Sequence, residues 1–153
     1  MKSILLPMDQ SEQMPSALET ARLAATLFGS SVEGVALRPA FTEVVAGDMM
    51  AITMPSADWD EIEYCRNLRQ TFDAYAAQHA GEPTKGVRFR WRAGSPITDA
   101  ALGNLARAYD LTVLSRPGIR GPLISTLESA LFDSGRPVLM APPSSPKSLV
   151  KRS

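Results

Sequence analysis

The residue types that bind phosphate occur in a turn between an apolar segment and a predicted helix. This turn, "SRPGIRGPLIS", runs from Ser115 to Ser125 and follows the apolar segment "LTVL". Such turns bind phosphate because glycines let backbone N–H groups approach it closely, and the N-terminus of the next helix adds further donors. Pro117 and Pro122 each remove one N–H donor. The pattern therefore indicates an anion-binding turn with a reduced set of donors.

Asp9 is the second candidate for chemistry, because it ends the apolar segment "SILLPM". In an open α/β sheet, ligands bind beyond the carboxyl ends of the strands. If the strands before Asp9 and Ser115 are neighbours, their loops face one crevice, where Asp9 would accept hydrogen bonds from a ribose. Asp9 is also suited to capping the following helix. Ser125 and Glu128 likewise fit a capping box, which competes with an anion for the same N–H groups.

The elements that must position these residues alternate along the chain. Short apolar or alternating segments predict strands near Ile4, Val35, Phe89, Val113 and Leu139, with helical patterns between them. Strands that alternate with helices pair in parallel through right-handed crossovers. We therefore predict a single α/β domain over residues 1–143, a doubly wound five-stranded parallel sheet with helices on both faces (Rossmann-like). Residues 144–153 are predicted to be a loose tail.

Three segments carry more specific predictions. In the helical segment that begins "DWDEIEY", we expect Ile62, Leu68, Phe72 and Tyr75 to face the core. In "SPITDAALGNLARAYD", Ser95 is predicted to cap a helix that has Pro96 at its first position. Residues 40–57 are irregular and fit either a flexible loop or a broken helix, with a functional flap as one interpretation.

The segment "VRFRWR" alternates strictly between apolar and basic residues. Arg88, Arg90 and Arg92 share one face, which predicts a strand with one solvated face at a sheet edge. These arginines either discourage edge-to-edge aggregation, pair with acids such as Asp60 and Glu61, or attract an anion or nucleic acid.

Composition limits the remaining function classes. Sixteen basic residues balance sixteen acidic ones, so no net charge attracts nucleic acid or anionic membrane, and nucleic-acid binding is not expected. The start of the chain lacks a secretion-signal pattern, and no apolar run reaches the ~20 residues of a membrane span. Cys65 has no partner for an internal disulfide, and His79 has no second histidine for a metal site. We expect a cytoplasmic chain without a bound metal.

Three segments resemble the universal stress protein family: "KSILLPMDQSEQMPSALETARLAA", "RAGSPITDAALGNLARAYDLTVLSRPG" and "LESALFDSGRPVLMAPP". The resemblance spans nearly the whole chain apart from the middle loop and the tail. It implies a five-stranded parallel sheet and a homodimer, which we expect to form through the last strand, "PVLMAP". In this strand apolar side chains face both sides of the sheet. Some family members bind ATP through a motif of Gly, two residues, Gly, nine residues, and Gly followed by Ser or Thr.

Only some positions of this motif are matched in this chain. Its first glycine falls on Ser115 and its third on Ile124, while Gly118 matches the second and Ser125 the hydroxyl residue. Only the five residues "IRGPL" separate Gly118 from Ile124, where the family has nine. The resemblance also puts three residues beside base and ribose, so the candidate nucleotide site comprises Pro7, Asp9, Leu37, Ser115, Gly118, Ser125 and Thr126.

Two functions are consistent with this pattern. The first is a dimeric, non-enzymatic stress-response module of the universal stress protein type, which binds ATP weakly or not at all and acts through an unidentified protein partner. The alternative is an ATP-binding member, with the nucleotide between Asp9 and the Ser115–Ser125 loop and slow hydrolysis. No cofactor is expected in the first case. An unrelated α/β enzyme has no support, because the sequence has no Walker loop, dinucleotide fingerprint or nucleophile elbow.

Overall fold

We analysed a computed structural model of the chain. It describes residues 3–10, 13–38, 43–44, 51–52, 60–79, 87–115 and 133–142.

A five-stranded sheet forms the centre of the described structure. Its strands lie in the order β5-β2-β1-β6-β7, and every pairing between neighbours is parallel. Its elements are β1 (Ser3–Met8), β2 (Ser31–Ala36), β5 (Arg88–Trp91), β6 (Leu111–Leu114) and β7 (Val138–Met140). The predicted α/β fold is confirmed, and all five strands lie where the sequence predicts them.

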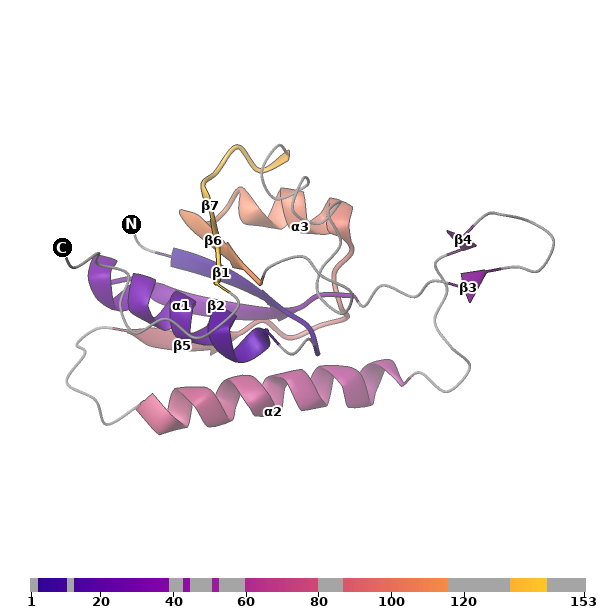
Figure 1. Cartoon of the computed structure of the whole chain (residues 1–153), viewed down its shortest axis with the longest axis horizontal. Coiled ribbons are helices and arrows are strands. Elements are labelled where there is room, and N and C mark those ends of the chain that lie inside the picture. Colours follow the sequence, from indigo (N-terminus) through magenta and orange to yellow (C-terminus); the bar gives the residue numbers. More distant parts are fainter. Residues whose placement is uncertain are drawn as a thin grey trace.

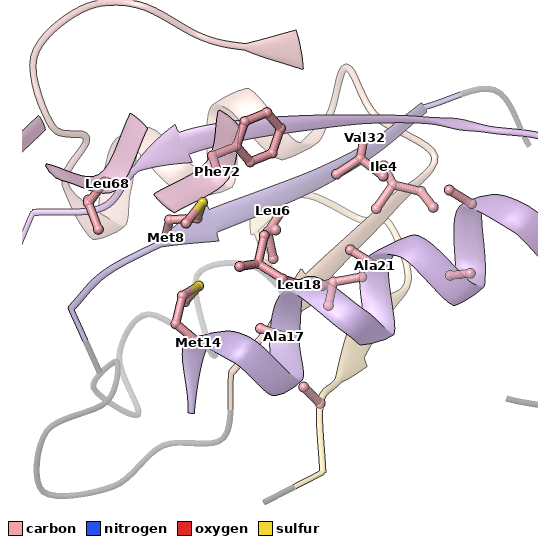
Figure 2. Packing of buried hydrophobic residues seen from close by; sticks show 14 of the residues in the cluster. Ile4, Leu6, Met8, Met14, Ala17, Leu18, Ala21, Val32, Leu68 and Phe72 are labelled. Atoms are coloured by element: carbon pink, nitrogen blue, oxygen red, sulfur yellow. The ribbon is translucent and has the colours of Figure 1, made fainter. Parts of the chain in front are cut away.

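Helices cover both faces of this sheet. Helices α1 (Met14–Phe28) and α2 (Glu61–His79) lie on one face, and α3 (Asp99–Ala106) lies on the other (Figure 1). Both faces of β1 are buried because it is the central strand, and its residues from Ile4 to Met8 are all buried. Figure 2 shows the larger core, where side chains of β1 meet residues of α1 and α2: Ile4, Leu6, Met8, Ala17, Leu18, Ala21, Leu68 and Phe72. The smaller core, under α3, contains Leu5, Val35, Leu102 and Leu114.

The inward face of α2 differs from the prediction at one position. Leu68 and Phe72 are buried and Tyr75 packs against the core, as expected, but Ile62 is 70% exposed. Tyr64 is buried in its place, at 4% exposure. The reason is the helical period, because positions 64, 68 and 72 follow one another at intervals of four, whereas position 62 lies on the opposite side.

The start of α3 also differs from the prediction. Ser95 does not cap the helix, which begins at Asp99 with Thr98 as its N-cap, and the Thr98 hydroxyl accepts a hydrogen bond from the Ala101 N–H at 3.3 Å. Ile97 instead forms a parallel bridge with Leu37, which extends the sheet by one residue pair. This bridge keeps the chain extended for three residues beyond the predicted cap.

Helix α2 is fixed to the sheet and to α1 by close contacts. An added Cβ at Gly34 of β2 would lie 2.8 Å from the Phe72 ring and 2.9 Å from Trp91, so glycine is what allows both rings to pack there. On the side of α1, the Tyr75 hydroxyl donates to Glu19, which also pairs with Arg22. Hydrogen bonds from Arg22 and Tyr75 hold the Glu19 pKa below its usual range, although burial alone would raise it.

Some predictions fall partly or wholly outside the described residues. Within segment 40–57, the structure describes two short antiparallel strands, β3 (Glu43–Val44) and β4 (Ala51–Ile52), so this segment contains β-structure that we did not predict. The flap interpretation, the last predicted helix with its Ser125–Glu128 capping box, and the 144–153 tail lie outside the described residues.

Candidate functional site

Three candidate residues follow three adjacent strands at the carboxyl edge of the sheet. Leu37 follows β2, Asp9 follows β1 and Ser115 follows β6, and these strands are neighbours in the order β2-β1-β6. All three residues are largely buried, with 3%, 9% and 2% of their surfaces exposed, respectively. Pro7 is also buried, near the end of β1. The expected adjacency of β1 and β6 is therefore confirmed, and Asp9 and Ser115 follow these two strands at the same sheet edge.

Backbone hydrogen bonds hold Leu37 beside the end of β1. The Leu37 N–H donates to the Met8 carbonyl at 2.8 Å. The Ile97 N–H donates to the Ala36 carbonyl at 2.9 Å, and the Arg38 N–H returns a bond to the Ile97 carbonyl at 2.8 Å. These bonds lengthen the sheet beyond β2, so the position of Leu37 relative to Asp9 is set by the sheet.

Tyr64 is a further residue of this site, and sequence reasoning missed it. Its hydroxyl donates a hydrogen bond of 2.6 Å to the Leu37 carbonyl. Burial raises the Tyr64 pKa, and the negative charge of Asp9 raises it further. Tyr64 therefore contacts Leu37 directly, and the charge of Asp9 acts on its pKa. The signal that could have identified it is its position four residues before Leu68, which itself lies four residues before Phe72.

The capping alternative for Asp9 does not match the start of α1. Gln13 occupies the N-cap position, and its side chain makes no capping hydrogen bond. Asp9 lies four residues earlier, directly after β1. The ribose interpretation of Asp9 stays a prediction.

The phosphate end of the predicted site lies mostly outside the described residues. Ser115 is described, whereas Gly118, Ser125 and Thr126 are not. For these three residues, the expectations from the sequence stay predictions.

Other chemistry is limited in the described part of the chain. No group of three His, Cys, Asp or Glu residues there is arranged to hold a metal ion. Cys65 is half-buried against the larger core, and burial raises the pKa of its thiol, which disfavours the thiolate needed by a nucleophile. Among the described helices, none has the length and apolar character needed to cross a membrane.

We expect Tyr64→Phe to lower the free energy of unfolding by about 1–3 kcal/mol, because the buried Leu37 carbonyl loses its hydroxyl donor. Urea denaturation measures this change. The matched control is Thr71→Ala, which removes an exposed hydroxyl that donates to the Asn67 carbonyl, and should cost less than about 0.5 kcal/mol. Equal effects of the two substitutions would contradict the role assigned to Tyr64.

The raised pKa of Tyr64 adds a dependence on pH. The folded state holds this proton more tightly than the unfolded state, in which tyrosine titrates near pH 10. The resulting stability is complete below about pH 10 and falls as the pH rises further. Tyr64→Phe should therefore reduce the loss of stability as the pH rises above about 10, although Tyr75, whose pKa is also raised, will keep part of that loss.

This architecture is shared with proteins of known structure. No protein-family model matches the sequence, and no curated protein matches it. Among solved structures, a universal stress protein from Lactobacillus plantarum has a TM-score of 0.62 at 15% identity, covering 92% of this chain and 97% of its own. A protein of the same family from Burkholderia pseudomallei has a TM-score of 0.59 at 20% identity, covering 92% of this chain and 96% of its own. This chain has the universal stress protein fold.

A third structure of this fold contains a nucleotide. The universal stress protein from Archaeoglobus fulgidus, solved in complex with dAMP, has a TM-score of 0.54 at 16% identity and covers 93% of this chain and 98% of its own. The fold that the sequence resemblance implies is thus confirmed over nearly the full length of the universal stress proteins compared.

Proposed function

We propose that this chain is a non-enzymatic, dimeric stress-response module of the universal stress protein type. In this proposal its site holds the base and ribose of an adenine nucleotide and binds ATP weakly or not at all. The observation that carries the proposal is the convergence of Asp9 and Leu37 at the ends of two adjacent strands, with the Tyr64 hydroxyl bonded to the Leu37 carbonyl.

The chemistry of these residues suits a nucleoside. A buried carboxylate is a strong acceptor for the two hydroxyls of a ribose, because charge-assisted hydrogen bonds gain strength away from water. Leu37 and Pro7 add apolar surface of the kind on which a base packs. The dAMP complex of the Archaeoglobus fulgidus protein, which has the same fold, supports a mononucleotide as the ligand class.

The sequence of the phosphate loop disfavours ATP. Relative to the family motif, the loop lacks four residues, and Ser115 and Ile124 replace two of three glycines. Pro117 and Pro122 remove two N–H donors. Because hydrolysis of ATP depends on positioning of the terminal phosphate, a loop that cannot hold this phosphate also lacks the means to hydrolyse it.

The alternative, an ATP-binding member with slow hydrolysis, is favoured by one feature of the same loop. Arg116 and Arg120 provide two cationic side chains for a triphosphate. Such side chains act as mobile contacts, whereas backbone N–H groups in a glycine loop are fixed in place, so we rank this alternative second.

Titration of nucleotide-free protein with AMP in a calorimeter tests the proposed site. We expect Asp9→Ala to weaken AMP binding by about 10- to 100-fold, through loss of a charge-assisted hydrogen bond. The matched control is Asp73→Ala, which removes an exposed carboxylate of α2 and should leave AMP binding unchanged. Wild-type protein that fails to bind AMP, or an Asp9→Ala variant that binds it normally, would contradict the proposed site. Release of phosphate from ATP by the wild type would contradict the non-enzymatic assignment.

A further inference from the structure

The two faces of β5 have opposite character. Phe89 and Trp91 face α2, where Trp91 lies 5.5 Å from Phe72 and Phe89 lies 6.0 Å from it, measured between ring centroids. Arg88, Arg90 and Arg92 alternate with these rings and are all exposed. The aromatic side therefore fixes the strand, while the arginine side is presented to solvent.

Among the described residues, little neutralising charge lies near these arginines. The ion pairs found in the described part of the chain, Arg22–Glu19 and Arg69–Asp73, do not involve them. Glu33 of β2 lies directly across from Arg90 and is the only acidic residue of β2, so it balances one of the three charges. Asp60 is engaged elsewhere, because its carboxylate accepts hydrogen bonds from the first backbone N–H groups of α2. The alternative in which the arginines pair with Asp60 or Glu61 is therefore not what the described residues show.

β5 also ends the sheet. It pairs with β2 on one side, and no described strand pairs with the other. The Arg92 N–H donates to the Gly34 carbonyl of β2 at 2.8 Å. Because successive backbone N–H groups of a strand point to alternate sides, those of Phe89 and Trp91 point away from β2. These outward groups can hydrogen-bond an additional extended segment.

The spacing of the charges matches that of an added strand. Alternate residues of a strand lie about 6.6 Å apart and on one face, so acidic residues at every second position of a new strand would each meet one arginine. Opposite charges directly across two strands attract, and like charges repel. Single-stranded nucleic acid is a poorer match, because its bases need exposed rings on which to stack, and Phe89 and Trp91 are turned into the core.

We propose that the outer edge of β5 binds an extended segment of a partner protein that carries Asp or Glu at alternating positions. The segment adds to the sheet as a sixth strand next to β5, with its acidic side chains beside Arg88, Arg90 and Arg92. This recognition mode combines backbone hydrogen bonds, which supply affinity, with alternate side chains, which supply specificity.

A fluorescent ten-residue peptide with Glu alternating with Thr tests the proposal by anisotropy. We expect saturable binding below about 1 mM, weakened by salt. Arg88→Glu combined with Arg90→Glu should weaken binding by about tenfold or more. The control, Arg66→Glu with Arg69→Glu, makes the same charge change on the exposed surface of α2 and should preserve binding. Equal loss in both double variants would overturn the assigned location.

Two further probes separate strand addition from simple charge attraction. The same peptide with N-methyl groups at alternate residues keeps its charge but loses the N–H groups that pair with β5, so we expect it to bind at least tenfold more weakly. Equal binding of the methylated peptide would overturn the added strand. A single-stranded oligonucleotide should bind more weakly than the acidic peptide, and tighter binding of the oligonucleotide would overturn the choice of an acidic protein segment.

Discussion

Restoring the phosphate loop is expected to raise ATP affinity by roughly 10²–10⁴-fold. The change replaces Ser115 and Ile124 with glycine, replaces Pro117 and Pro122 with alanine to return their N–H donors, and inserts four residues between positions 118 and 124, which returns the loop to the spacing of the universal stress protein motif. The physical reason is the recovery of about two charge-assisted hydrogen bonds, each worth about 1.5–3 kcal/mol, where 1.4 kcal/mol corresponds to a factor of ten. Calorimetric titration with ATP measures the gain.

Two controls make this expectation specific. Inserting the four residues without the glycine replacements should give little gain, because length alone does not allow the backbone to approach the phosphates. Asp9→Ala in the restored background should reduce the regained affinity, since the base and ribose end is shared by both versions of the site. A fully restored loop that leaves ATP affinity unchanged would contradict the explanation based on lost donors.

We expect the wild-type protein to form a homodimer through β7, and Met140→Asp to weaken it by about 100-fold or more. β7 lies at the edge of the sheet opposite β5, and Met140 is 39% exposed there while Val138 and Leu139 are half-buried. An unpaired strand edge with apolar side chains favours pairing with a second copy. In a two-fold symmetric interface the new carboxylate appears twice, and each copy would be buried without a partner charge.

Sedimentation at micromolar concentration measures the dimer. The matched control is Ile62→Asp, which introduces the same charge at another exposed apolar residue, on α2, and should leave the dimer intact. A monomeric wild type would contradict the proposed dimer. A dimer that persists with Met140→Asp would show that a different surface forms it.

The fold was predictable because each strand and helix is marked locally. Pro15 lies in the first turn of α1 and Gly29 directly follows its last residue, so the sequence marks both ends of the helix where the structure has them. Gly29 also adopts the left-handed conformation that favours glycine. The start of α3 was not predictable from local signals. Ser95 and Pro96 form a good helix start on their own, but the bridge between Ile97 and Leu37 depends on a strand far away in the sequence.

The site was only partly predictable for a similar reason. Asp9 and Ser115 were identified because residues after parallel strands gather at one edge of the sheet, whereas Leu37 was identified through the family resemblance. Tyr64 was missed because its bond to the Leu37 carbonyl depends on how α2 packs across the sheet, which the helical pattern alone does not specify. The arginines of β5 were placed correctly at an exposed edge, since strict alternation in a strand determines which face each residue occupies.

We propose that the base and ribose end of the site persists without a phosphate end. The most direct test is calorimetric titration of nucleotide-free wild-type protein with ATP and AMP under identical conditions. Because the loop has few donors for additional phosphates, we predict dissociation constants for the two nucleotides within about tenfold of each other. A micromolar dissociation constant for ATP, more than about 100-fold tighter than that for AMP, would contradict the account and establish the ATP-binding alternative.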